Sequence, residues 1–245
     1  MPANTAVRSL LNAPDVNHER AAKTLPFGEL VALPSSVTAD VSLWRLDRCG
    51  DNFAAARSLL TADDWRELSR LRGDGRERAF AVRALLRAAL TQAVNGAIAP
   101  EAWQFTRSPY GKLLLAPHLP ALDFSISHAG LTSCIAISTS GRIGLDIEHC
   151  AVPNWHSLAD DFLLSTDRDM INRAPPAERE CAFSHAWTAK EAFAKLLGVG
   201  LAMSAPANDC GFGTRLATWQ LESPSGALSI SLAFDEPVER ELKRA

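Results

Sequence analysis

The sequence lacks three features that would each define a class of protein. Its five cysteines are scattered, odd in number and never spaced as Cys-x-x-Cys, which argues against a zinc cluster or a disulfide framework and predicts reduced thiols. No apolar run approaches the roughly 18 residues of a membrane span, and the first residues lack the apolar centre of a signal peptide. The net charge of −3 offers nucleic acid no general positive surface. We therefore expect a cytoplasmic protein with neither a membrane nor a nucleic-acid partner.

What is present fits a globular chain of one large domain or two small ones. The 245 residues are 47% hydrophobic and 22% charged, which is ordinary for a protein with a substantial core. Residues 1–38 show no clear period and predict a partly ordered arm. Strand, helices and a strand pair follow from Val41 to Leu115, and the same order recurs from Arg142 to Phe234. This coarse repeat predicts two similar halves with a cleft between them.

Periodicity places the expected elements along the chain. Alternating apolar residues predict strands, and apolar spacings of three and four predict helices packed along one side. Thr61, followed by two acids, is typical of a helix start. The expected strands are 41–46, 102–107, 112–115, 122–127, 133–138, 142–148, 215–221 and 227–234, and the expected helices are 52–72, 79–93 and those within the 45 residues after Pro153.

The stretch from Arg142 to Glu148 carries two acids inside an alternating run. In a strand, Asp146 and Glu148 would share one face with Gly144, whose missing side chain would leave room for a bulky group beside the carboxylates. Carboxylate oxygens suit Mg²⁺, which usually takes only one or two protein carboxylates and fills its other positions with water and phosphate. The alternative is a half-exposed edge strand with solvated acids.

A second group of charges lies on the last helix before Gly198. Trp187, Glu191 and Lys195 are spaced by four and therefore share one helix face, with Lys190 next to Glu191. This arrangement holds an acid between two bases. It would also arise from a surface ion pair beside a core tryptophan.

Seven arginines fall within the 22 residues from Arg66 to Arg87. Guanidinium groups bind phosphate oxygens with two parallel hydrogen bonds, so two or three of these arginines could clamp a phosphorylated ligand. A solvated helix surface is the other interpretation. Lys112, beside a glycine turn, and His128, at a strand end, are further candidates for binding an anion.

Together these segments resemble the two-part signature of the 4′-phosphopantetheinyl transferase superfamily. The resemblance covers roughly residues 41 to 200 and is closest to the larger, single-chain type that activates surfactin synthetase. It implies an α+β fold of two pseudo-symmetric halves, each a small antiparallel sheet packed with helices: residues 39–140 to bind coenzyme A, and 141–245 for Mg²⁺ and catalysis. The matching residues are Ile143-Gly144-Leu145-Asp146-x-Glu148, Trp187-x-x-Lys190-Glu191-Ala192-x-x-Lys195, Tyr110-Gly111-Lys112, Phe124-Ser125-Ile126-Ser127-His128 and the helix from Arg78 to Arg87.

The resemblance implies transfer of 4′-phosphopantetheine from coenzyme A to a serine of an apo acyl or peptidyl carrier protein, releasing 3′,5′-ADP. It implies a monomer that serves fatty-acid, polyketide, siderophore or other secondary-metabolite synthesis. Three acids would hold Mg²⁺, three lysines would lie near the pyrophosphate, and a further group would lie near the adenosine 3′-phosphate. These sets are Asp146, Glu148 and Glu191; Lys190, Lys195 and Lys112; and Ser127, His128, Arg78 and, less directly, Arg83.

The group that takes the serine proton stays open at this point. Glu191, Lys190 or a metal-bound water could serve. Members of the family often carry a glutamate where this chain has Arg168, between Asp167 and Asp169. A coenzyme- or carrier-binding protein without catalysis is therefore a second hypothesis. A Mg²⁺ nuclease is a third, although its usual Glu-x-Lys is absent after the strand acids.

Overall fold

The computed structural model describes residues 24–25, 28–47, 56–199 and 214–235. In chain order the first elements are β1 (Thr24–Leu25), β2 (Gly28–Val31), β3 (Val41–Asp47), α3 (Ala62–Leu68), α4 (Asp74–Ala93), η1 (Pro100–Ala102), β4 (Phe105–Arg107), β5 (Leu113–Leu115), β6 (Asp123–Ala129) and β7 (Thr132–Ser138). They are followed by β8 (Ile143–His149), α5 (Trp155–Phe162), α6 (Ser165–Arg173), η2 (Pro176–Glu178), α7 (Arg179–Leu197), β9 (Thr214–Ser223) and β10 (Gly226–Asp235).

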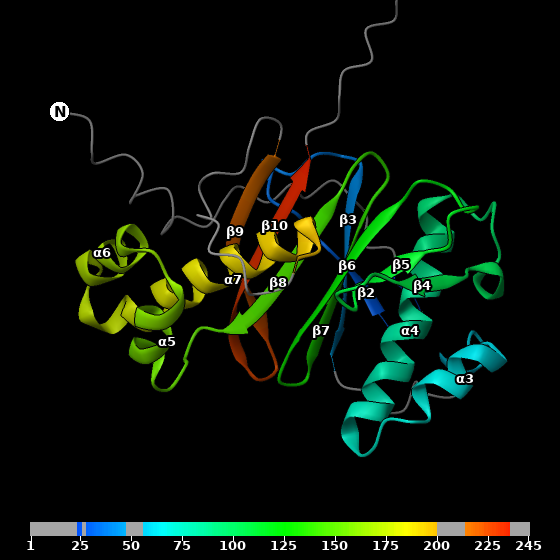
Figure 1. Ribbon diagram of the computed structural model, residues 1–245, viewed down its shortest axis with the longest axis horizontal. Helices are drawn as coiled ribbons and strands as arrows, with labels where there is room; N and C mark the ends of the chain where they lie inside the picture. Colours follow the sequence, from blue (N-terminus) through cyan, green and yellow to red (C-terminus); the bar gives the residue numbers. More distant parts are fainter. Residues whose placement is uncertain (1–23, 26–27, 48–55, 200–213, 236–245) are drawn as a thin grey trace, which may run out of the picture.

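The N-terminal half is an antiparallel sheet with α4 packed on one face (Figure 1). Its strand order is β1-β2-β3-β7-β6. Because side chains alternate along a strand, β7 serves two cores: Ile135 and Ile137 pack with Leu85 of α4, while Cys134 and Ala136 face the opposite side.

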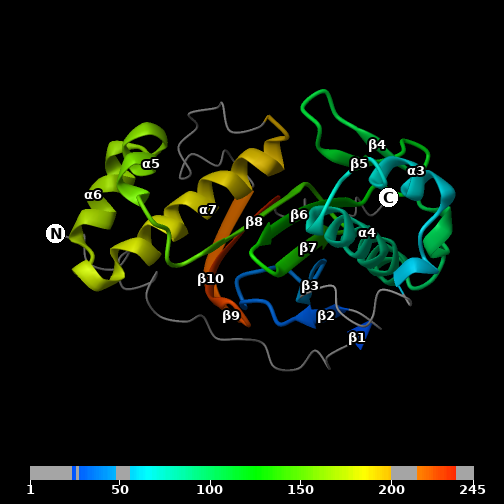
Figure 2. The ribbon, with the colours of Figure 1, turned by 90° about the horizontal axis from the view of Figure 1, so that it is seen from below.

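The C-terminal half is a second antiparallel sheet, ordered β8-β10-β9, with α7 lying across it (Figures 1 and 2). Ile143, Leu145 and Ile147 of β8 are fully buried in the core that the two sheets share, together with residues of β3, β7, β9 and β10. Gly144 faces the other way and meets α7, and Asp146 shares its side. The alternation predicted for this stretch is confirmed.

Side chains, rather than backbone carbonyls, join the two sheets where β6 lies beside β8. Side chains at alternate positions of β6 accept hydrogen bonds from the backbone N–H groups at alternate positions of β8. These N–H groups would otherwise be buried without a partner, which is costly. The bonds run from Ile143 N to Asp123 Oδ2 (2.9 Å), from Leu145 N to Ser125 Oγ (2.9 Å) and from Ile147 N to Ser127 Oγ (3.3 Å).

The expected α+β fold with two helix-packed antiparallel sheets is therefore confirmed, with local differences. Residues 28–31, assigned to the arm, form β2 and pair with β3, whereas residues 1–23 lie outside the described chain. In the region expected to be helical from 52 to 72, α3 is short and begins at Ala62, after the N-cap Thr61, which forms a capping box with Asp64. The strand expected from residue 102 begins only at Phe105, after a turn of 3₁₀ helix. None of the described helices has the length and apolar character needed to cross a bilayer.

Candidate active site

The close packing of β8 against α7 creates the site. A Cβ atom on Gly144 would lie 1.9 Å from the Ala192 carbonyl oxygen and 2.5 Å from Leu196 N, so only glycine allows this approach. The space expected for a ligand beside Gly144 is instead filled by the backbone of α7. This contact brings Glu191 and Lys195 of α7 to the acids of β8.

Asp146 is the buried centre of the group. Its Oδ1 accepts hydrogen bonds from Lys195 Nζ at 2.6 Å and from Ser127 Oγ at 2.8 Å, and Lys195 Nζ also donates to Ser127 Oγ at 3.0 Å. Its Oδ2 is buried without a hydrogen-bond partner. Burial raises the pKa of Asp146, although the ammonium of Lys195 opposes that rise. A buried carboxylate oxygen without a donor is the kind of atom that a cation would satisfy.

The charge of Asp146 affects the pKa of two half-buried glutamates, Glu148 and Glu191. Burial raises the pKa of Glu148 to about 7, and the negative charges of Asp146 and Glu191 add to the rise. Burial and the charge of Asp146 likewise raise the pKa of Glu191 to about 7, against the opposing charges of Lys195 and Lys190. Acids whose pKa is raised by burial and by a neighbouring carboxylate are candidates for a functional site.

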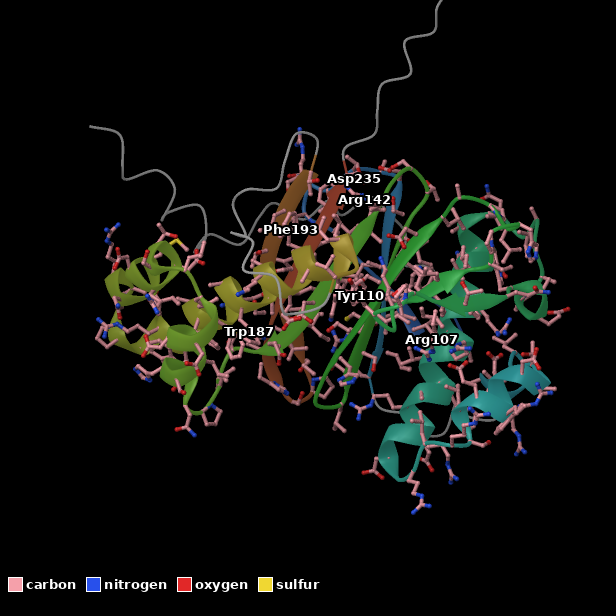
Figure 3. All side chains as sticks on the ribbon, viewed as in Figure 1. Arg107, Tyr110, Arg142, Trp187, Phe193 and Asp235 are labelled. Atoms are coloured by element: carbon pink, nitrogen blue, oxygen red, sulfur yellow. The ribbon has the colours of Figure 1, made fainter. Side chains whose placement is uncertain are left out.

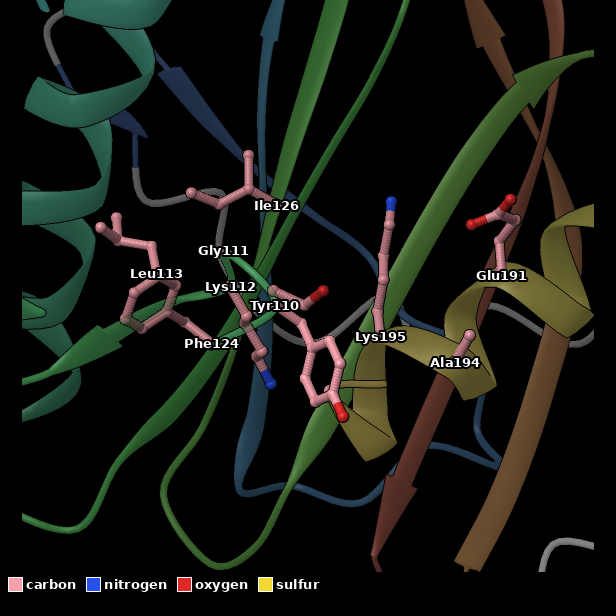
Figure 4. A pocket seen from close by; sticks show the side chains of 11 residues that line it. Tyr110, Gly111, Lys112, Leu113, Phe124, Ile126, Glu191, Ala194 and Lys195 are labelled. Carbon is pink, nitrogen blue, oxygen red and sulfur yellow. The ribbon is translucent and has the colours of Figure 1, made fainter. Parts of the chain in front are cut away.

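A cavity of about 400 Å³ opens beside this group, between the two halves of the protein. Lys112 and Tyr110 line one side, and Lys195 and Glu191 of α7 line the other (Figure 4). Lys112 Nζ is held by Asp123 Oδ2 at 3.1 Å. Two lysines therefore border a cavity that also contains an acid, which suits a ligand with negatively charged groups.

Arg78 and His128 form a second group beside the acids. Arg78 Nη1 donates to the Gly130 carbonyl oxygen in the turn after β6 at 3.2 Å. Partial burial of the ring, followed by the charge of Arg78, lowers the pKa of His128; Lys195 acts in the same direction and Asp146 opposes it. The structure thus brings Arg78 and His128 together, near Lys195 and Asp146.

Arg83 is not brought to this site. Only 6% of its surface is exposed, and its guanidinium donates to Asp64 Oδ1 at 2.6 Å and to Glu67 Oε2 at 3.2 Å. Arg87 Nε donates to the same Asp64 at 2.7 Å. The central arginines of the predicted phosphate clamp instead fasten α3 to α4, because a buried guanidinium needs a carboxylate partner.

Lys190 and Arg168 lie at the other end of the site, near the helix pair α5–α6. Lys190 Nζ donates to the carbonyl oxygen of Phe162 at the end of α5. Arg168 Nη1 donates to the Asp160 carbonyl oxygen at 3.0 Å, so this side chain ties α6 to α5. Trp187, labelled in Figure 3, packs edge-on against Phe162 with ring centroids 5.7 Å apart. Trp187 thus anchors α5 to α7.

Asp123 and Ser125 support the site, although the sequence pattern gave neither residue a role. Asp123 holds both Lys112 and the backbone N–H of Ile143, and Ser125 holds the N–H of Leu145. Both lie on the same face of β6 as Ser127, so the alternation of that strand contained the signal.

The donor chemistry around Asp146 fits a magnesium ion. The site offers hard carboxylate oxygens, one of them buried and unpaired. Among the described residues, no three His, Cys, Asp or Glu side chains are already spaced as a ready-made metal site. A closed protein cage is unnecessary, because Mg²⁺ commonly uses one or two carboxylates and completes its shell with water and phosphate.

Comparisons with known proteins agree with this geometry. The model of the 4′-phosphopantetheinyl transferase superfamily matches residues 142–225, which contain β8, α7 and the acids on both. The 4′-phosphopantetheinyl transferase HetI of Nostoc sp. is 27% identical over 169 residues, covering 66% of this chain and 70% of HetI. A 4′-phosphopantetheinyl transferase of Bacillus subtilis is 33% identical over 119 residues, covering 49% and 51%. Sfp of Bacillus subtilis is 34% identical over 100 residues, covering 41% and 43%.

Over residues 142–225 the chain is thus similar to the 4′-phosphopantetheinyl transferase superfamily. Apart from HetI, the compared relatives are matched over about half of their length or less.

Proposed function

We propose that this protein transfers the 4′-phosphopantetheine group from coenzyme A to a serine of an apo acyl or peptidyl carrier protein, giving holo carrier and 3′,5′-ADP. The observation that carries the proposal is the meeting of Asp146 and Glu148 from β8 with Glu191 and Lys195 from α7 beside a cavity between the halves. Acids next to lysines at a cavity match a pyrophosphate donor that binds with Mg²⁺.

Each group has a role in this reaction. Asp146, Glu148 and Glu191 would hold Mg²⁺, which would neutralise charge on the pyrophosphate. Lys112 and Lys195 border the cavity and supply positive charge where the phosphate–oxygen bond breaks. The bound ion and these lysines would act on the same leaving group.

Lys190 and the adenosine end of the coenzyme complete the assignment. Lys190 lies near the helix pair α5–α6 and would reach the pyrophosphate only by releasing Phe162. Arg78 and His128 would bind the 3′-phosphate of the adenosine, and the proposal excludes Arg83 because its guanidinium is already paired. Ser127 orients Asp146 rather than touching the nucleotide.

Glu191 is the group that we assign to the serine proton. A general base must lie within reach of the hydroxyl proton, and Glu191 lines the cavity that would receive the coenzyme and the carrier serine. We further propose that the protein acts as a cytoplasmic monomer of the larger single-chain type, on carriers of fatty-acid, polyketide or other secondary-metabolite synthesis.

Mass spectrometry of apo carriers tests the proposal. Incubation with coenzyme A, Mg²⁺ and a panel of acyl and peptidyl carriers should add one phosphopantetheine to the serine of at least one carrier. Chelation of Mg²⁺ should stop the transfer, and restored Mg²⁺ should return it. Coenzyme A binding by calorimetry without a product on any carrier would instead identify a coenzyme-binding protein without catalysis.

A pair of isosteric variants separates the site from the fold. Asp146→Asn keeps the shape of the side chain but removes its charge, and we expect transfer to fall by about 100-fold or more with the melting temperature retained. Asp63→Asn changes an exposed acid on α3 and should leave transfer unchanged. Full activity of Asp146→Asn would remove this residue from the metal site.

A further inference from the structure

Two cysteines that take no part in the proposed transfer lie side by side. Cys150 directly follows β8 and Cys181 is the third residue of α7, yet their Sγ atoms are 2.9 Å apart. This separation is shorter than an ordinary non-bonded contact, and a disulfide bond of about 2.05 Å would need only a small further approach. Both side chains are partly exposed, so small oxidants can reach them.

The surroundings of Cys181 favour its thiolate. Gln220 Nε2 donates to Cys181 Sγ at 3.0 Å, and His185 Nε2 lies 3.6 Å from the same sulfur. The first turn of α7 adds the positive end of the helix dipole. The hydrogen bond with Cys150 lowers the pKa of Cys181, burial opposes this shift, and His185 and Gln220 reinforce it. A nucleophilic thiolate next to a second thiol is the arrangement that disulfide chemistry requires.

The spacing does not suit a metal ion. Two thiolates on one tetrahedral zinc stand about 3.8 Å apart, as follows from a zinc–sulfur bond of about 2.3 Å. The two sulfurs here are closer than that, at 2.9 Å. The part of the chain that the structure describes also contains no group of three side chains suited to a metal, even with His185 beside the pair.

We propose that Cys150 and Cys181 form a reversible disulfide upon exposure to a peroxide, with Cys181 as the attacking sulfur. The Cys181 thiolate attacks one oxygen of hydrogen peroxide, the O–O bond breaks, and hydroxide leaves as Cys181 becomes a sulfenic acid. The Cys150 sulfur then attacks Cys181, the S–O bond breaks, and the departing hydroxide takes the Cys150 proton as water. Two thiols are oxidised by two electrons while one peroxide is reduced to two waters.

The disulfide would close a loop that contains α5 and α6, which lie at the N-terminal end of α7 in Figure 1. Closing a loop of about 30 residues restricts the unfolded chain, so we expect the melting temperature to rise by roughly 5–10 °C on oxidation. Glu191 lies ten residues, or roughly 15 Å, further along the helix, so the bond would hold the helix pair without reaching the acids.

Peptide mapping of the full chain tests the pairing. The protein is treated with hydrogen peroxide, blocked with iodoacetamide and digested with trypsin, which places Cys150 in peptide 143–168 and Cys181 in peptide 180–190. We expect these two peptides as the main cross-link, its loss with dithiothreitol, and the higher melting temperature only in the oxidised sample. Absence of this cross-link, or a main cross-link through another cysteine, would overturn the proposal.

Single variants test which sulfur attacks. In Cys150→Ser, limited peroxide with dimedone should label Cys181 as a trapped sulfenic acid. In Cys181→Ser, Cys150 should show no more label than Cys134, which is fully buried and serves as the internal control because burial raises its pKa to about 12. Equal labelling of Cys150 and Cys181 in the two variants would refute Cys181 as the nucleophile.

A third variant tests the role of the imidazole. In His185→Gln, alkylation of Cys181 should require a higher pH than in the wild type, because one of the groups that lower its pKa is gone. An unchanged pH profile would remove His185 from the activation of Cys181.

Discussion

At the scale of single residues, Gly144 sets the distance between β8 and α7. In Gly144→Ala the new methyl group would meet the Ala192 carbonyl oxygen at 1.9 Å, and backbone cannot give way as a side-chain end can. We expect the free energy of unfolding to fall by about 1–3 kcal/mol or more. Thermal and urea denaturation measure this loss, and transfer activity should fall further because Glu191 and Lys195 move with α7.

Gly75→Ala is the matched control. Gly75 lies in the first turn of α4, where an added Cβ meets nothing within 4 Å. Alanine there should stabilise the protein by about 0.4–1 kcal/mol, since it restricts the unfolded chain. Equal stability changes at Gly144 and Gly75 would show that the contact with α7 does not constrain the strand.

Gly144 also shows what single residues in a sequence do and do not tell. The alternation of Ile143, Leu145 and Ile147 was enough to predict the strand and to place Asp146 on its other face. Whether a glycine on that face admits a ligand or a neighbouring helix depends on backbone contacts with distant residues. Nothing in the local pattern records those contacts, so the glycine was predicted to leave space that α7 in fact fills.

At the scale of elements, α3 is fastened to α4 through one buried carboxylate. Asp64 accepts hydrogen bonds from both Arg83 and Arg87 and caps its own helix through Thr61. Asp64→Ala would leave two buried guanidinium groups without their common partner. We expect a loss of about 3–5 kcal/mol in the free energy of unfolding, measured by urea denaturation.

The neighbouring acid provides the comparison for that variant. Asp63 pairs with Arg66 at 2.8 Å, but both side chains are more than 70% exposed. Asp63→Ala should therefore cost less than about 1 kcal/mol. A similar cost for Asp63 and Asp64 would mean that the buried network contributes no more than a surface pair.

The junction of β6 and β8 is a second contact between elements that can be tested. Ser125 is buried and supplies the acceptor for Leu145 N. Ser125→Ala would leave that N–H unsatisfied, at an expected cost of about 1–3 kcal/mol in urea denaturation. Thr139→Ala, which removes an exposed hydrogen bond to the Asp40 carbonyl oxygen, should change stability by less than about 0.5 kcal/mol. A neutral Ser125→Ala would show that another acceptor replaces the hydroxyl.

Elements differ in how well the sequence predicts them. The strands around Asp146 and the helix that ends at Gly198 follow from periodicity and capping, and the structure confirms them. The density of arginine indicated either a phosphate clamp or a solvated helix surface, but charge density does not tell which arginines meet carboxylates. Arg83 and Arg87 point into the protein because both donate hydrogen bonds to the buried Asp64. Arg78, nearer the start of α4, instead donates to the Gly130 carbonyl oxygen beside the candidate active site. Pairings between distant residues, such as Cys150 with Cys181, are equally hidden.

At the scale of the whole molecule, Asp64 and the acids of the candidate active site change the stability of the protein with pH in opposite directions. Burial by itself would raise the pKa of Asp64, but its hydrogen bonds from Arg87 and Thr61 and the charges of Arg87 and Arg83 lower it overall. Its contribution to stability is therefore present above the unfolded pKa of 3.8 and is lost as the pH falls. Ionised Asp64 therefore stabilises the fold at neutral pH, and this stabilisation is lost when Asp64 is protonated in acid.

The site acids act in the other direction. Burial raises the pKa of Glu148 and Glu191 from 4.5 to about 7, so between these values the folded state binds more protons than the unfolded state. The stability linked to these protons is fully present below pH 4.5 and is lost as the pH rises through about 7. Without a cation, the ionised site is a cost to the fold.

The melting temperature of the metal-free protein should therefore be highest in mildly acidic solution and should fall as the pH is raised from about 5.5 to about 8. Calorimetry across this range measures the slope, and Glu148→Gln combined with Glu191→Gln should flatten it, because neither replacement titrates. Added Mg²⁺ should raise the melting temperature more at the upper end of the range than at the lower end, since the ion binds ionised carboxylates and competes with their protons. An equally steep slope in the double variant would assign the pH dependence to other groups, and a stabilisation by Mg²⁺ that is independent of pH would place the ion away from these acids.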